Sequence, residues 1–360
     1  MSEAQNNRVY YAVHAVGLAE NGTSGYKAAS GVQNVGLNTT FNLEQIFQLG
    51  QLSDYEQVEN APDVEVTIEK VLDGAPLVQH LATPAATSPT LAGRYNNNKS
   101  NIVLNYYNDA NDNASGDPKS QVLCSGMFVS AITMTLPVDG NFTEAVTFVG
   151  NNKLWATGTS LGSGQYGFAP GWEGQVAPLG ADLQPDSYND NAAPPAVSGV
   201  QRRENLIMSG CKWPLDIYGI SSSGSNNLHT DGDKFLVHAQ SVTISTDLGR
   251  TELFELGRKG PYHRFSDFPT EVTCAIEITE TEFGDQVQAL EDVNNVVNRE
   301  IYFVTTDGTQ INLGTKNRLG STTSSGGDTG GGNRTTTYNY SNFNILKITN
   351  IETDPAGQDA

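Results

Sequence analysis

Side chains that could act as nucleophiles, general bases or metal ligands are scattered along this 360-residue chain. None of its histidines (His14, His80, His229, His238, His263) forms an HExxH motif, and none of its cysteines (Cys124, Cys211, Cys274) a CxxC motif. No G-x-S-x-G nucleophile elbow occurs. With 40 Asp and Glu residues, close carboxylate pairs arise by accident, so spacing alone indicates no glycosidase pair. We therefore predict no catalytic residue, no metal site, no cofactor and no enzymatic activity.

Two stretches resemble binding motifs but lack their context. GSGQYG at Gly162–Gly167 has the glycine spacing of a dinucleotide loop, but no strand precedes it and no helical pattern follows. Asp109, Asn111 and Asn113 have calcium-loop spacing, but Ala114 and Ser120 replace the required Gly and Glu. We interpret both stretches as loops. A separate alternative is sugar binding, because the asparagine-rich loops carry aromatic rings that could stack on sugars, at Tyr95, Tyr107, Tyr166 and Tyr188.

Composition limits the partners and the compartment. The net charge of −20 disfavours binding to nucleic acid and to anionic membranes. Three cysteines are not a disulfide framework and favour a reducing compartment. No apolar run reaches membrane-spanning length and no signal peptide is recognisable, so we expect no membrane insertion.

The strongest signal is an internal repeat. Residues Gln33–Pro62 return as Gln240–Pro269 with eight identities in thirty ungapped positions, where chance gives about two. Among the matches is a Phe-x-Leu-Gly element, which we interpret as the repeat-defining core: Phe47, Leu49 and Gly50 in the first copy, Phe254, Leu256 and Gly257 in the second.

The repeat continues as a strand in both copies. Val64, Val66 and Ile68 alternate with polar residues, as do Val272, Cys274, Ile276 and Ile278. The second strand is displaced by one residue, which suggests a β-bulge. A short helical pattern follows each strand, at residues 77–81 and 285–293.

This order predicts a mainly β protein of two similar β-sandwich or barrel modules, each with one short helix. We assign residues 1–150 to the first module, 151–233 to an insertion with long loops and connecting strands, 234–352 to the second module and 353–360 to a frayed tail. Hairpin turns are expected at residues 138–141 and 307–308, strand character over 204–218, and flexible Gly/Ser loop over 320–333.

Residues Pro62–Thr83, Cys124–Trp155 and Phe235–Gly260 resemble bacteriophage tail tube proteins. The resemblance implies a virion protein of the tail, assembled in the host cytoplasm. It implies a ring that stacks into a conduit for DNA. Three chains with two modules each, in pseudo-sixfold symmetry, are favoured over six chains. The implied partners are further copies of the chain, tape measure, terminator, baseplate and possibly sheath proteins, while genomic DNA passes without specific binding.

An acidic wall would let DNA slide, because it repels phosphates. Glu65 and Glu69, on the face opposite the apolar side chains, are the candidate lumen or interface residues in the first copy, with Glu271 and Glu277 in the second. Solvent exposure on an outer sheet would explain the same pattern. The alternatives are a baseplate or adaptor tube protein, and a carbohydrate- or receptor-binding β-sandwich.

Overall fold

The computed structural model describes residues 9, 11–20, 26–83, 91–107, 118–157, 199–208, 210–214, 230–231, 234–235, 238–279, 297–326 and 333–350. Over these residues the protein is mainly β, which confirms the predicted fold class. No helix in the described ranges is long and apolar enough to cross a membrane.

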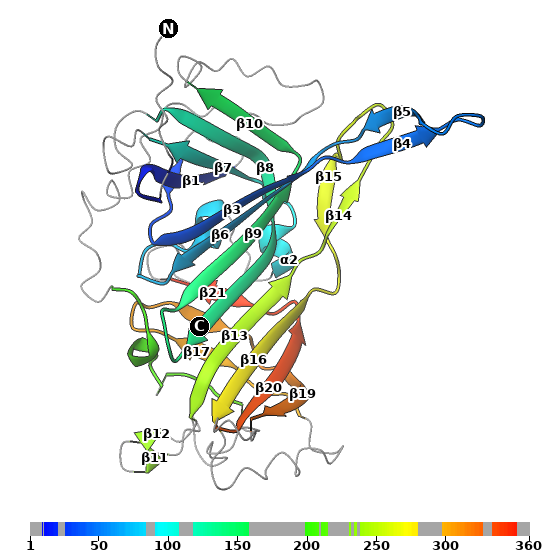
Figure 1. Cartoon of the computed structure of the whole chain (residues 1–360). Coiled ribbons are helices and arrows are strands. Elements are labelled where there is room, and N and C mark those ends of the chain that lie inside the picture. The colour runs from blue at the N-terminus through cyan, green and yellow to red at the C-terminus, as the bar shows by residue number, and fades with distance from the viewer. Residues whose placement is uncertain are drawn as a thin grey trace.

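One antiparallel sheet organises the molecule (Figure 1). Eight strands lie side by side in it, in the order β3 (Val32–Thr40), β6 (Asp63–Val71), β9 (Thr143–Gly150), β8 (Ser120–Pro137), β13 (Ala239–Asp247), β16 (Glu271–Thr279), β20 (Thr335–Phe343) and β19 (Arg318–Ser325). Both predicted modules therefore contribute to a single sheet, joined where β8 meets β13.

Strand β8 belongs to two layers. Its 18 residues change partners near Gly126, which has a positive φ of 66° that favours glycine. Beyond this point the strand pairs with β9 and β13, and before it with β7 (Ser100–Tyr106) and β10 (Asn152–Thr157). Strand β1 (His14–Glu20) pairs with β7 and with β2 (Lys27–Ala28).

The core lies on one side of the eight strands, where helices and a small sheet cover them (Figure 1). These covering elements are α1 (Val78–Ala82), α2 (Leu91–Tyr95), β17 (Tyr302–Val304), β18 (Gln310–Asn312) and β21 (Lys347–Thr349). The buried Glu144 holds α1 by accepting the N–H groups of Val78 and Gln79 at 2.8 and 3.3 Å. His80 Nε2 lies 2.9 Å from the Ile348 carbonyl, so α1 also contacts β21.

The two halves of the sheet pair in the same register. Val35 faces Ile68 in β3–β6, and Val242 faces Ile276 in β13–β16. Both pairs carry a register shift at the same place, after Val32 and after Ala239. The one-residue slip between the repeats is therefore not a bulge in one of them. The extra residue lies in the connection before β16, which is one residue longer than the connection before β6.

Each connection is a β-hairpin that leaves the sheet. Arm 1, residues 41–62, contains β4 (Leu43–Phe47) and β5 (Asp54–Glu59); arm 2, residues 248–270, contains β14 (Arg250–Leu253) and β15 (His263–Ser266). The arms also share their register, because Ile46 faces Glu56 and Leu253 faces His263.

The repeat-defining residues are not core, contrary to the sequence prediction. Phe47 and Leu49 are 64% and 101% exposed at the tip of arm 1, and Phe254 and Leu256 are 58% and 104% exposed on arm 2. Gly50 and Gly257, with φ of 92° and 90°, form the turns. The glycine of the motif recurs because both tips need this left-handed turn, which glycine adopts without strain.

Several smaller expectations have definite outcomes. The turns at 138–141 and 307–308 are confirmed, between β8 and β9 and between β17 and β18. Within the stretch 204–218, the described residues 204–208 and 210–214 form no strand; they hold the end of a 3₁₀ helix (Arg203–Asn205) and two isolated bridges. Residues 320–325 are not loop but part of β19, because Ser and Thr side chains there bond across to β20.

The remaining short elements are a 3₁₀ helix at Tyr11–Val13 and the strands β11 (Thr230–Asp231) and β12 (Lys234–Phe235). The second predicted helix, GSGQYG, the calcium-like loop, the tail and most of the predicted insertion lie outside the described residues.

Candidate assembly interface

The potentially reactive side chains occupy positions that suppress reactivity. All three cysteines are free and buried. Burial raises the pKa of the Cys124 thiol to about 12 and of the Cys211 thiol to about 11, and it also raises the pKa of Cys274. Thiolate formation, which nucleophilic attack requires, is therefore opposed. No group of three or more His, Cys, Asp or Glu residues in the described ranges could hold a metal ion.

The tyrosines proposed for sugar stacking are only partly described. Tyr95 and Tyr107 are 2% and 4% exposed, so neither ring offers a face to a ligand. The hydroxyl of Tyr95 donates to Gln79 Oε1 at 2.6 Å inside the core. These two residues do not form a sugar platform, and Tyr166 and Tyr188 lie outside the described residues.

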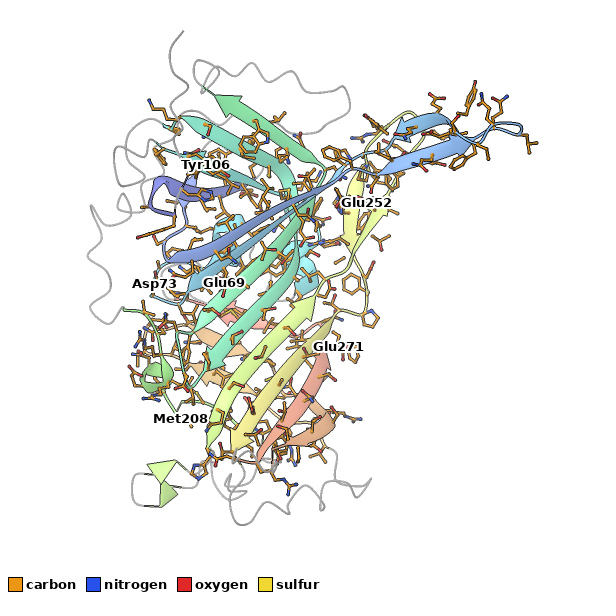
Figure 2. All side chains as sticks on the ribbon, in the orientation of Figure 1. Glu69, Asp73, Tyr106, Met208, Glu252 and Glu271 are labelled. Carbon is orange, nitrogen blue, oxygen red and sulfur yellow. The ribbon has the colours of Figure 1, made fainter. Side chains whose placement is uncertain are left out.

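The four candidate glutamates share the uncovered face of the sheet. Glu65 and Glu271 are exposed, and Glu69 and Glu277 are half-buried, with Glu69 and Glu271 labelled in Figure 2. Their neighbours on this face are largely hydroxyl side chains that bond across the strands. Thr67 lies 3.3 Å from Thr147, Ser245 lies 2.7 Å from Thr273, and Ser241 donates to Glu277 at 3.1 Å. This arrangement gives a polar face on which the four carboxylates lie on β6 and β16.

The join between the two halves is a continuous antiparallel ladder. Strand β8 pairs with β13 from Ser241–Pro137 to Asp247–Ala131, with Ile244 opposite Met134. Among the described strands, β3 pairs only with β6 and β19 only with β20. The sheet therefore ends in two free edges, β3 and β19. By the repeat, β3 corresponds to β13. Strand β19 corresponds to β8, because Leu319 faces Tyr340 as Val129 faces Phe148, with a register shift after each pair.

Burial differs between these corresponding strands. Val242 and Ile244 on β13 are 2% and 1% exposed, whereas their equivalents on β3, Val35 and Leu37, are only partly buried. On the other edge, Ile132 of β8 is 1% exposed and its equivalent in β19, Thr322, is half-buried. The contrast follows from the missing neighbour, because β13 and β8 cover one another and the outer strands are uncovered.

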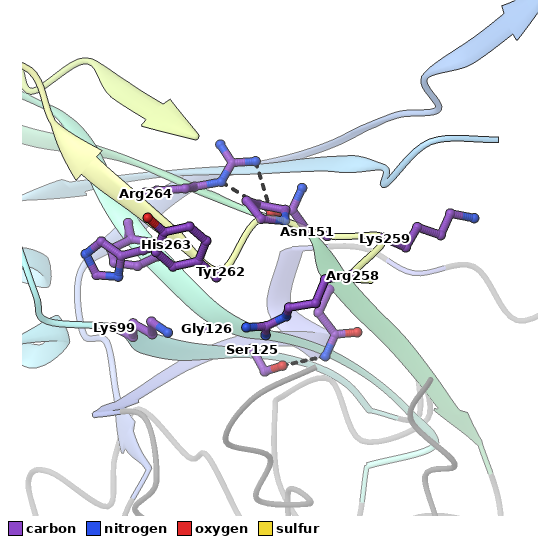
Figure 3. A pocket seen from close by; sticks show the side chains of 13 residues that line it. Lys99, Ser125, Gly126, Asn151, Arg258, Lys259, Tyr262, His263 and Arg264 are labelled. Atoms are coloured by element: carbon purple, nitrogen blue, oxygen red, sulfur yellow. Dashed lines mark hydrogen bonds between the residues drawn. The ribbon is translucent and has the colours of Figure 1, made fainter. Parts of the chain in front are cut away.

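A polar pocket marks the contact between arm 2 and the first half of the sheet (Figure 3). Its lining includes Lys99, Arg258, Lys259 and Arg264. The buried Arg264 guanidinium binds Asp63 at 2.8 Å, Asn151 at 3.1 Å and the carboxylate of Glu252. Because Arg264 is held by side chains from both sides of the contact, the pocket is a structural joint that fixes arm 2.

Sequence reasoning missed the free edges and the exposed arms. The two copies share apolar residues at the hairpin tips, Phe47 with Phe254 and Leu49 with Leu256. From sequence alone, recurring apolar residues are assigned to the core. Their exposure becomes evident only when the strand pairing shows that they lie on hairpins outside the sheet.

Comparison with known proteins gives structural neighbours only. No family model matches the chain, and no curated protein matches its sequence. One similar structure is a chain from the baseplate of the anti-feeding prophage, with 11% identity, a TM-score of 0.32, and coverage of 42% of this chain and 98% of that chain.

Two further neighbours come from related particles. A chain from the sheath–tube complex of an extracellular contractile injection system has 10% identity and a TM-score of 0.32, over 44% of this chain and 99% of that chain. A chain from the virion of a gene transfer agent particle has 12% identity and a TM-score of 0.27, over 42% and 99%.

Proposed function

We propose that this chain is the structural subunit of a phage-type tail tube, built from two copies of one module. Three chains would close into a ring by pairing β19 of each copy with β3 of the next. The observation that carries this proposal is the β8–β13 ladder, which already joins the two modules of one chain through the corresponding strands.

An open sheet with two complementary edges is suited to such closure. Unpaired edge strands expose backbone N–H and C=O groups and invite further strand pairing. Because β3 and β19 are different surfaces, the contact is heterologous, and a heterologous contact produces a ring when the rotation closes. The polar strand β19 is soluble while unpaired, since its side chains are largely Ser and Thr.

The function of the ring would be mechanical. The core elements cover one face of the sheet, which leaves the face with Glu65, Glu69, Glu271 and Glu277 to line the bore. Carboxylates repel the phosphates of DNA, so that the genome would pass without sticking. Further partners would be tape measure, terminator, baseplate and possibly sheath proteins, in a virion tail assembled in the host cytoplasm.

The internal ladder also predicts the register between chains. Ser245 faces Thr133 inside the chain, and their equivalents are Asn38 in β3 and Thr323 in β19. Directly opposed antiparallel residues have Cα atoms about 4.5–5.5 Å apart, a separation that a disulfide can span. Asn38→Cys combined with Thr323→Cys should therefore link copies of the chain covalently after mild oxidation.

The test combines this pair with electron microscopy of the purified wild-type protein. Threefold rings or tubes in the micrographs would support the proposal, as would covalently linked dimers and trimers, with no larger species, after oxidation. The matched control, Thr67→Cys with Thr323→Cys, moves one thiol to β6, one strand from the edge, and should link poorly. Monodisperse single chains together with no linkage of the Asn38 and Thr323 variants would refute the proposal. Rings that never stack would favour a baseplate or adaptor position instead.

A further inference from the structure

The two arms, which correspond residue by residue, have opposite environments. Arm 2 lies against its own chain: the Leu248 N–H donates to the Ser130 carbonyl at 2.7 Å, and Leu248 is 0% exposed. The His263 ring meets Phe128 edge-on with centroids 5.2 Å apart. Arm 1 projects away from the body in Figure 1. The residue of arm 1 equivalent to Leu248 is Phe41, which is 70% exposed, and the residue equivalent to His263 is Glu56, which is also exposed.

The surface that receives arm 2 also has a counterpart. Val129 of β8 faces Phe148, and Leu319 of β19 faces Tyr340, in ladders with the same register shift. Phe128 therefore corresponds to Arg318. By the same reasoning through β6 and β16, Asp63 corresponds to Glu271. Arg318 and Glu271 are exposed at the end of the second half of the sheet.

We propose that arm 1 docks on the next copy of this chain as arm 2 docks within the chain, with Glu56 opposite Arg318 and Gln57 opposite Glu271. This inference rests on the proposed ring, and it identifies a second contact across the same edge. Phe41 would take the buried position that Leu248 occupies, beside the backbone of Gly320.

Charge complementarity supports the assignment. Within the chain, the first contact is aromatic, between Phe128 and His263, and its counterpart joins the carboxylate of Glu56 to the guanidinium of Arg318. The second contact is the Arg264–Asp63 ion pair, whose counterpart is an amide donor, Gln57, facing the carboxylate of Glu271. In each case both partners have changed together, and the new pair remains favourable.

The changes also determine which surface arm 1 prefers. Arm 1 carries four acidic residues and no Lys or Arg: Glu44, Asp54, Glu56 and Glu59. On the first half of the sheet its Glu56 would face the ring of Phe128, with Lys99 Nζ 5.6 Å from the ring centroid, whereas on the second half it directly opposes the Arg318 guanidinium. The pairing therefore favours head-to-tail contact between copies over exchange of the two arms.

Charge reversal tests the contact in the full-length protein. Glu56→Arg and Arg318→Glu, each alone, place like charges together and should raise the protein concentration for half-maximal ring formation by about tenfold or more. Combining them restores the opposite charges and should recover most of the loss. Glu44→Arg is the matched control, because its equivalent on the docked arm 2, Thr251, is exposed, whereas the neighbouring Arg250 and Glu252 bind Val129 and Arg264.

Thiol linkage gives a second measurement that does not depend on stability. Glu56→Cys with Arg318→Cys should be joined between copies by a short bis-maleimide cross-linker, because the equivalent pair, His263 and Phe128, meets through its rings. The buried native cysteines do not compete. Rings that form equally well in both charge-reversal variants, without this cross-link, would overturn the docking while leaving the ring intact. A wild-type protein without rings would overturn both.

Discussion

Phe41 and Leu248 stand at the same position of the two arms, immediately after β3 and after β13, and they differ completely in exposure. Leu248 is 0% exposed because β8 of the same chain lies beside it, whereas Phe41 is 70% exposed at the free edge. The two residues hold the same position in the repeat, and a neighbouring strand is present only beside Leu248.

This relationship makes a prediction about stability. Leu248→Ala should lower the free energy of unfolding by about 2–5 kcal/mol, because it leaves a cavity in the core. Phe41→Ala should change the unfolding free energy of the single chain by about 0.5 kcal/mol or less, yet weaken ring formation. Urea unfolding of single chains, compared with ring formation, separates the effects. Equal destabilisation by both substitutions would contradict the assignment.

The anchoring of arm 2 gives a second prediction. Arg264→Ala removes the contacts to Asp63, Asn151 and Glu252, and should cost about 1.5–3 kcal/mol. The tip of arm 2, which carries Arg258 and Lys259, should then be cut faster by trypsin. The matched control is Arg202→Ala, since Arg202 is exposed and its side chain donates to Asn141. Unchanged cleavage in the Arg264 variant would show that the joint is not what holds the arm.

A pH dependence follows from Glu144, which is fully buried between Lys70 and the start of α1. Burial raises the pKa of this carboxyl, and Lys70 and two backbone N–H groups offset only part of the effect. A raised pKa in the folded state means that the folded protein holds the proton more tightly than the unfolded chain. This contribution is complete below the ordinary pKa of 4.5 and is lost as the pH rises through the folded value.

Glu144→Gln isolates this contribution because the amide does not titrate. The unfolding free energy of the wild type minus that of the variant should fall as the pH increases from 4 towards neutrality. The total fall should be about 1.4 kcal/mol for each unit by which the folded-state pKa of Glu144 exceeds its unfolded-state pKa. Denaturant unfolding at a series of pH values measures the difference. A difference that rises with pH would mean that the folded state lowers the pKa.

The cysteines provide a chemical prediction. Since Cys124, Cys211 and Cys274 are buried and burial raises the pKa of each thiol, none should react with iodoacetamide in the native protein at pH 8. All three should react in urea, as mass spectrometry would record. Rapid native labelling of any of them would contradict the described packing.

Much of the local structure could be predicted from sequence because its signal is local. Alternation of Val64, Val66 and Ile68 with polar residues indicated β6, and the same alternation indicated β16, because a strand turns successive side chains to opposite faces. The displacement by one residue was also visible, but its cause was not. It arises in the connection before β16 and leaves the ladder registers the same.

The errors concern residues whose environment depends on distant parts of the chain. The Phe-x-Leu-Gly elements were predicted to be core because they recur and are apolar, but they form exposed turns. The Ser- and Thr-rich segment over residues 320–325 was predicted to be loop, but β20 pairs with it. In both cases the amino-acid composition of the segment does not reveal whether another strand lies beside it in the fold.

The sequence by itself determined the mainly β class, the repeat, and which strand faces are polar, because each depends on side chains a few residues apart. Only the tertiary structure decided that β8 and β13 join the halves, that β3 and β19 remain as edges, and that arm 2 is docked while arm 1 projects. The physical reason is that strand pairing brings together residues such as Met134 and Ile244, 110 positions apart, and no local pattern specifies which distant edge a strand will meet.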